Sequence, residues 1–157
     1  MSHYAKNTSV SVERSEAEIK RVLLKYGVSE IMSGMSREKN LAFVMFKWDN
    51  LPIKIRIPLP DFNDPKFQET PGGRKNRTKE AANKEWEKAA RQQWRVLLLM
   101  IKSQCETIVN GIFPAAEVFM PWLMLPNNMT AFEFAAEDLR RMCETGKMPK
   151  LLPLGKG

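Results

Sequence analysis

The chain has 157 residues, of which 43% are hydrophobic, and it carries a formal net charge of +7. This length and apolar content suit a single domain with one core. No apolar run approaches the roughly 18 residues that a membrane-spanning helix needs, and the polar start MSHYAKNTSVSVERSE is unlike a signal peptide. We therefore expect a soluble cytoplasmic protein without a membrane partner.

The first 60 residues predict a helix followed by three strands. Ser15 and Glu18 have the spacing of a capping box, and apolar residues follow at helical spacing up to Gly27. Strands are expected at 28–33, 41–48 and 53–58. In the last of them, isoleucines alternate with Lys54 and Arg56, which is the two-residue period of a strand with one buried face. Short polar turns between the segments favour an antiparallel meander.

A long helix and a helical C-terminal part are expected in the rest of the chain. Thr78 can cap a helix that Gly111 stops, and Thr130 with Glu133 forms a capping box for a later helix that ends near Gly146. The predicted class is α+β, with a three-stranded antiparallel sheet packed on the long helix in the order α-β-β-β-α. We expect one domain over 1–157, made of a flexible N-terminal segment at 1–14, a core at 15–110, and a C-terminal helical extension and tail at 111–157.

The long helix is predicted to be amphipathic. Trp86, Leu97 and Ile101 fall on one side and are expected to pack on the strand isoleucines. Residues 66–102 hold ten lysines and arginines against four acidic residues. This uneven basic charge favours a polyanionic partner, although a solvated helix face has the same composition. Six cations lie within about 40° of one line on the other side of the helix, namely Arg77, Lys84, Lys88, Arg91, Arg95 and Lys102.

Residue types that carry catalysis are scarce. His3 is the only histidine and lies near the N-terminus, which argues against histidine-based acid–base chemistry. Cys105 and Cys143 lie far apart in predicted helices, so we expect reduced, buried thiols rather than a disulfide or zinc ligands. Asp61 and Asp64 can hold magnesium but are also ordinary turn residues. We expect no enzyme activity, no cofactor and no metal.

The candidate binding residues come from a loop, the long helix and the strands. The loop TPGGRKNRT (70–78) can close over nucleic acid at a helix N-terminus, or it can be a plain connector. On the sheet, cations beside Phe43 and Met45 form the kind of platform on which single-stranded nucleic acid stacks. The alternative, which we favour, is that the C-terminal third covers this platform as core. The candidate nucleic-acid-binding residues are Arg74, Lys75, Arg77, Lys79, Lys84, Lys88, Arg91, Arg95, Lys54 and Arg56.

One resemblance bears directly on these residues. The order helix, three strands, helix, with GGRKNRTKEAANKEWEKAA opening the second helix, resembles the double-stranded RNA-binding domain over roughly residues 15 to 100. The loop before the second helix is longer than in that domain, and 58–66 has no counterpart. The resemblance implies phosphate contacts by Lys75, Arg77, Lys79 and Lys84.

A wider resemblance covers nearly the whole chain. The segments YAKNTSVSVERSEAEIKRVLLKYG, IPLPD, RQQWRVLLLMIKSQCETIVNGI and TGKMPKLLP are similar to a family of small uncharacterised phage and prophage-encoded proteins. This resemblance implies a phage setting in the cytoplasm of a host cell, and it implies no active residues.

We therefore expect a non-catalytic nucleic-acid-binding accessory protein of a phage. Single-stranded DNA in replication or recombination is the favoured ligand, and a homo-oligomer is compatible with the sequence. The alternative is a protein-binding module that inhibits a host or defence protein. A metal-dependent enzyme that uses scattered carboxylates is a third interpretation.

Overall fold

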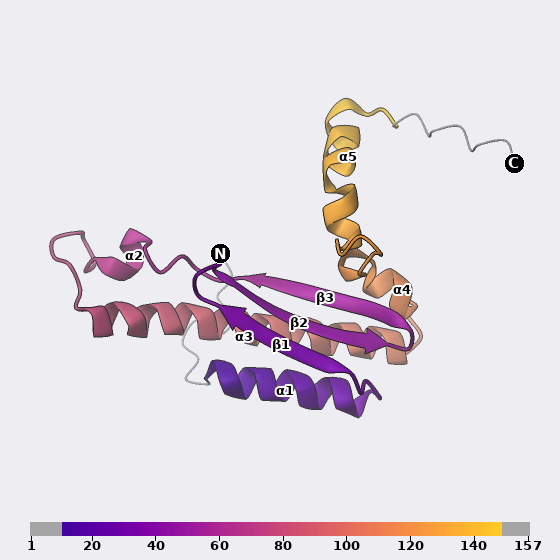
Figure 1. Ribbon diagram of the computed structural model, residues 1–157, viewed down its shortest axis with the longest axis horizontal. Coiled ribbons are helices and arrows are strands. Elements are labelled where there is room, and N and C mark those ends of the chain that lie inside the picture. Colours follow the sequence, from indigo (N-terminus) through magenta and orange to yellow (C-terminus); the bar gives the residue numbers. More distant parts are fainter. Residues whose placement is uncertain (1–10, 149–157) are drawn as a thin grey trace, which may run out of the picture.

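Two layers make up the body of the protein, a three-stranded antiparallel sheet and a pair of helices on one of its faces (Figure 1). The computed structural model describes residues 11–148. The α+β class and the helix–sheet–helix order are confirmed. The elements are α1 (Val12–Lys25), β1 (Ile31–Ser36), β2 (Leu41–Trp48), β3 (Leu51–Pro58), α2 (Pro65–Gln68), α3 (Lys79–Val109), α4 (Ala115–Val118), the 3-10 helix η1 (Met120–Trp122) and α5 (Ala131–Thr145).

Helix α1 begins about one turn earlier than the sequence predicts. Its N-cap is Ser11, whose hydroxyl accepts a hydrogen bond from the Arg14 N–H at 3.2 Å. Ser15 is fully buried inside the helix and donates its hydroxyl proton to the Ser11 carbonyl. The predicted capping box at Ser15 is therefore wrong, because Ser15 lies on the buried face with Ile19 and Leu23. Part of the segment expected to be flexible, 12–14, is helical, while 1–10 lies outside the described residues.

The sheet is a meander in the order β1-β2-β3. Its two turns place Asn40 and Asp49 at φ values of 47° and 52°, a region that Asn and Asp enter more readily than other side chains. Strand β1 starts later than predicted. The reason is that Val28 is held in the turn that closes α1, since its N–H donates to the Leu23 carbonyl at 3.1 Å.

The core lies between the inner face of the sheet and the two long helices. Val44 of β2 and Ile55 of β3 are 0% and 2% exposed, and α3 meets them with Trp86 and Leu97, which are 2% and 6% exposed. Lys88 on the other side of α3 is exposed. The predicted orientation of the long helix is therefore confirmed. Within residues 11–148, no helix combines the length and the apolar content that a membrane span requires.

The first turns of α3 extend beyond the sheet and carry a small lobe built from α2 and the loop that follows it (Figure 1). Phe67 of α2 is buried in this lobe. Asp64 caps α2, and its bond to the Lys66 side chain, together with the bond from the Lys66 N–H, holds the pKa of its carboxyl below the ordinary value. Asp61 accepts a hydrogen bond from the Asn63 N–H at 2.9 Å. Both aspartates thus have turn and capping roles.

The C-terminal segment is joined to the edge strand β3. Leu123 forms an antiparallel bridge with Ile53, and the Met124 N–H donates to the Pro52 carbonyl at 2.9 Å. Helix α5 then projects away from the body (Figure 1). Its predicted capping box at Thr130 is confirmed, because the Glu133 N–H donates to the threonine hydroxyl oxygen while the glutamate side chain accepts from the Thr130 N–H.

Helix α5 is expected to lose stability on acidification through Glu133. The backbone N–H and the hydroxyl of Thr130, with the Arg56 guanidinium nearby, hold the pKa of Glu133 below its ordinary value. A carboxyl whose pKa is lower in the folded chain than in the unfolded chain stabilises the fold at pH values above its unfolded pKa. That stabilisation is lost as the pH falls through the folded pKa.

Amide hydrogen exchange in the first turn of α5 measures this effect. The Glu133→Gln variant should exchange faster than the wild-type protein near neutral pH. The two proteins should become alike once the pH is below the folded pKa of Glu133. Equal protection near neutral pH would show that the carboxylate adds nothing to the cap.

Candidate nucleic-acid interface

Five of the six cations predicted in a row on the long helix lie on α3, in three different environments, whereas Arg77 lies in the loop before α3. Lys84, Lys88 and Lys102 are exposed, and within residues 11–148 no carboxylate pairs with them. Arg91 is partly buried, and its Nε atom has no hydrogen-bond partner among the described residues. Arg95 pairs with Glu18 of α1 at 2.9 Å. The exposed lysines are therefore available to an external anion, whereas Arg95 is already engaged.

Helix α1 contributes further cations beside this row. The two helices lie side by side, joined by the Arg95–Glu18 pair and by a hydrogen bond from the Tyr26 hydroxyl to Glu106. Three α1 cations share the Glu18 side of the helix by their spacing of seven and four residues. Together with the α3 cations they form what we call the helix-layer basic face, which comprises Arg14, Arg21, Lys25, Lys84, Lys88, Arg91, Arg95 and Lys102.

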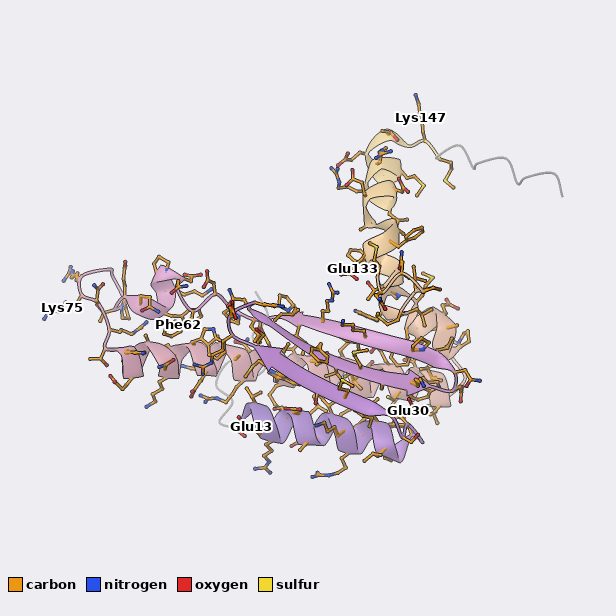
Figure 2. All side chains as sticks on the ribbon, viewed as in Figure 1. Glu13, Glu30, Phe62, Lys75, Glu133 and Lys147 are labelled. Carbon is orange, nitrogen blue, oxygen red and sulfur yellow. The ribbon has the colours of Figure 1, made fainter. Side chains whose placement is uncertain are left out.

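The helix-layer basic face is long and straight. Lys84 and Lys102 are separated by about 27 Å along α3, at about 1.5 Å of rise per residue. Nitrogen-tipped side chains point away from the sheet along α1 and the first half of α3 (Figure 2). The arrangement provides a row of positive charge on the side of the helices that faces solvent.

The loop before α3 lies at the far end of this row, where Figure 2 labels Lys75. It is shaped by its own hydrogen bonds, including one from the Thr70 N–H to the Lys75 carbonyl at 2.8 Å. The Arg77 guanidinium donates to the carbonyls of Lys66 and Phe67 at 2.8 and 3.2 Å, so it holds the loop against α2. The exposed cations here are Arg74, Lys75 and Lys79.

The two strand cations lie on the outer face of the sheet, opposite the helix layer. The Lys54 ammonium lies 5.8 Å from the centre of the Phe43 ring. Arg56 pairs with Glu133 of α5. The predicted binding residues are thus divided between two opposite surfaces, and a single ligand on one surface does not reach the other.

As far as residue 148, the C-terminal third contacts the β3 edge of the sheet but leaves most of its outer face uncovered. Helix α5 points away from the sheet (Figure 1), and its Phe132 is 59% exposed. The expectation that this segment covers the strand platform is therefore wrong, because the bonds of Leu123 and Met124 to β3 direct α5 outward. Phe43 is half-buried for a different reason. Its ring lies over Gly34, where an added Cβ would stand only 2.8 Å from the ring.

Reactive side chains do not gather into a site in the described part of the chain. Burial raises the pKa of the Cys105 thiol to about 12, so this thiol stays protonated. Cys143 is exposed on α5, which corrects the prediction that both thiols are buried. Between residues 11 and 148, no group of three or more His, Cys, Asp and Glu side chains is placed to hold a metal ion. The predicted C-terminal tail falls largely in 149–157, outside the described residues.

Comparisons with protein-family models, with curated proteins and with solved structures give no match. Function is therefore inferred from the fold and its surfaces.

Sequence reasoning missed two features of these surfaces. It assigned no role to Arg14, Arg21 and Lys25, although their spacing is visible in the sequence, because the side of α1 that meets α3 is set only by tertiary packing. It also expected the C-terminal third, which contains α5, to cover the strand platform. The sequence signal for an exposed α5 is weak, since an amphipathic helix normally buries its apolar side.

Proposed function

We propose that this chain is a non-catalytic nucleic-acid-binding protein that holds phosphates with the helix-layer basic face. The observation that carries the proposal is the row of exposed lysines on α3 that no carboxylate within residues 11–148 neutralises, continued by Arg21 on the neighbouring helix. Arg74, Lys75 and Lys79 extend this row at one end. Each phosphate that such a row neutralises releases counterions, so binding is favourable and sensitive to salt.

The proposed contacts are sequence-independent. Lysines at solvent-facing helix positions contact backbone phosphates, which position a nucleic acid without specifying its bases. Base reading requires side chains that enter a groove or stack on bases. Among the strand residues, 31–58, Phe43 is the one aromatic side chain on the outer face of the sheet, and its ring is held against Gly34. We therefore place the nucleic acid on the helix layer and not on the sheet.

The polymer we propose is single-stranded DNA. A flexible single strand can follow the straight row of cations over its full length of about 27 Å. A duplex is a stiff rod, with a persistence length of about 50 nm, and its strands wind away from a straight row. In the phage setting that the sequence resemblance implies, such an activity belongs to DNA replication or recombination.

Fluorescence anisotropy with labelled single-stranded DNA, duplex DNA and RNA of equal length tests the proposal. We expect the tightest binding to single-stranded DNA, and a fall of the binding constant with rising salt at a slope of about −0.7 per neutralised phosphate. Several contacts would make that slope steep. Binding that is absent at low salt, or that does not change with salt, would refute the proposal.

A second candidate function is a protein-binding module that inhibits a host or defence protein. The exposed apolar side of α5 favours it, since no residue of this helix is buried. This function predicts a defined complex whose stability changes little with salt, because apolar contacts are not screened. Size-exclusion chromatography of mixtures with host proteins, at low and high salt, separates it from the first candidate.

A further inference from the structure

Helix α5 is a complete helix whose apolar side is not covered by any other element within residues 11–148. Its four residues with large or polarisable apolar side chains on one side, Phe132, Leu139, Met142 and Cys143, lie within about 100° of each other by helical spacing. Phe132 and Leu139 are 59% and 47% exposed, and none of the 15 residues of the helix is buried. A helix of this type is stable in a protein when another element covers its apolar side.

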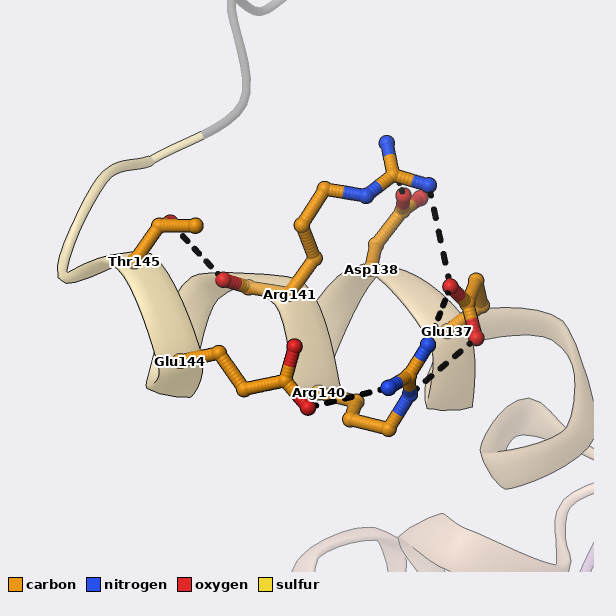
Figure 3. Close-up of polar contacts among 6 residues, drawn as sticks. All are labelled: Glu137, Asp138, Arg140, Arg141, Glu144 and Thr145. Atoms are coloured by element: carbon orange, nitrogen blue, oxygen red, sulfur yellow. Dashed lines mark hydrogen bonds and ion pairs between the residues drawn. The ribbon is translucent and has the colours of Figure 1, made fainter.

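The charged side of α5 needs no partner. Arg140 pairs with Glu137 and Glu144 at 2.8 and 2.9 Å, and Arg141 reaches Glu137 and Asp138 at 3.8 and 3.9 Å (Figure 3). These pairs satisfy the charges within the helix itself. The part of α5 that would gain stability from a partner is therefore its apolar side.

The outer face of the sheet is the matching surface, since no helix of the described part of the chain lies on it (Figure 1). Met32 of β1 is 60% exposed, and with Met45 of β2 it lines a pocket of about 320 Å³ across the strands. A second pocket of about 550 Å³ lies where α5 leaves the body, lined among others by Lys54 and Phe132. Covering such an apolar sheet face with another element removes apolar surface from water and is therefore favourable.

The two surfaces agree in size. Two cations on the outer face of the sheet, Lys47 and Arg56, already pair with Glu30 and Glu133 of the same chain, so the complementarity between the helix and the sheet is apolar. The 15 residues of α5 span about 22 Å, and the eight residues of β2 span about 26 Å. The helix can therefore lie on the sheet along its whole length.

The helix is held away from its own sheet. The Ala131 N–H donates to the Leu123 carbonyl at 2.8 Å, and Glu133 pairs with Arg56 at the edge strand. These contacts fix the first turn of α5 in an outward direction (Figure 1). Folding back would break them, whereas contact with the sheet of a second copy of the chain leaves them intact.

We propose that the protein forms a two-fold symmetric dimer in which α5 of each chain covers the outer face of the other chain's sheet. The contact is reciprocal, so one interface contains two identical helix-on-sheet contacts. Stable interfaces bury about 1,200 to 2,000 Å² in total. Each helix-on-sheet contact then has to bury only about half of that area. The dimer leaves the helix-layer basic face open on both chains.

Analytical ultracentrifugation of the full chain without nucleic acid tests the dimer, so its outcome is independent of the proposed DNA binding. The wild-type protein is expected at twice the 18.1 kDa mass of one chain. Leu139→Lys on α5 and Met45→Glu on the sheet are each expected to give monomers. Phe134→Lys is the matched control, because Phe134 is 64% exposed but lies about 140° around the helix from the apolar side. It should stay dimeric.

Mixing the two monomeric variants gives the sharpest result. In a mixed pair, the unaltered α5 of the Met45→Glu chain can contact the unaltered sheet of the Leu139→Lys chain. One of the two helix-on-sheet contacts is therefore restored with wild-type residues on both sides. We expect dimers in the mixture. A monomeric wild-type protein would overturn the proposal, and so would a monomeric Phe134→Lys variant. A dimeric Met45→Glu variant would also overturn it, because it would indicate that the two α5 helices pair with each other and not with the sheets. Circular dichroism of each variant confirms that it is folded. A mixture of the two folded variants that stays monomeric would also contradict the proposed dimer.

Discussion

Replacing Trp86 with alanine is expected to lower the free energy of unfolding by about 3 to 5 kcal/mol. Trp86 is 2% exposed and lies where α3 meets the segment that follows β3. Its indole N–H donates to the Pro60 carbonyl at 2.7 Å, and the Arg37 guanidinium lies 4.4 Å from the ring centre. The truncation removes core volume and leaves the Pro60 carbonyl without its donor. Since small domains are stable by about 5 to 15 kcal/mol, the loss is a large share of the total.

Trp86→Phe is the control for this effect. It keeps an aromatic ring but removes the N–H donor, so it should cost less than the alanine variant. The missing hydrogen bond alone accounts for about 1 to 3 kcal/mol when its partner stays buried. Urea unfolding followed by circular dichroism measures both variants. An alanine variant as stable as the wild type would mean that Trp86 is not part of the core.

The Lys84→Gln, Lys88→Gln, Lys102→Gln triple variant is expected to bind single-stranded DNA about 10- to 100-fold more weakly near physiological salt. The salt slope of its binding should be shallower by about 2, since each lost phosphate contact removes about 0.7 from the slope for a single strand. The fold should be unaffected, because all three side chains are exposed and have no ion pair within residues 11–148. Anisotropy titrations at several salt concentrations give both quantities.

A variant with the same loss of charge on the opposite face separates local contact from total charge. Lys47→Gln, Lys54→Gln and Arg56→Gln remove three cations from the outer face of the sheet. This control is expected to keep the wild-type salt slope. If the two triple variants weaken binding equally, net charge alone drives the binding and the helix-layer basic face has no special role.

The sequence predicts the layered core because the apolar residues of each segment recur with a single spacing, either that of a strand or that of a helix. One face of the last strand carries Ile53, Ile55 and Ile57, and one side of the long helix carries Trp86 and Leu97. Packing that strand face against that side of the helix buries both sets, and all five residues are buried. The caps at Thr78 and Thr130 are found for a similar reason. Their hydroxyls accept hydrogen bonds from backbone N–H groups three residues further on, so a short motif determines the structure.

The predictions that failed depend on contacts between distant segments. Ser11 and Ser15 can each cap a helix, and only the burial of Ser15 against the core decides between them. Whether α5 covers the sheet depends on the antiparallel β-bridge between Leu123 and Ile53, which no local sequence pattern predicts. The combined basic surface of two helices likewise depends on how α1 lies against α3, as the Arg95–Glu18 pair records.

Lysine footprinting tests the proposed interface most directly. Light acetylation of the full chain, with and without a single-stranded oligonucleotide at low salt, reports the protection of each lysine by mass spectrometry. We predict that Lys84, Lys88 and Lys102 become protected when the oligonucleotide is added, while Lys54 on the outer face of the sheet and Lys147 beyond α5 do not change. Protection at Lys54 without protection at Lys84 and Lys88, or no protection at any lysine, would contradict binding through the helix-layer basic face.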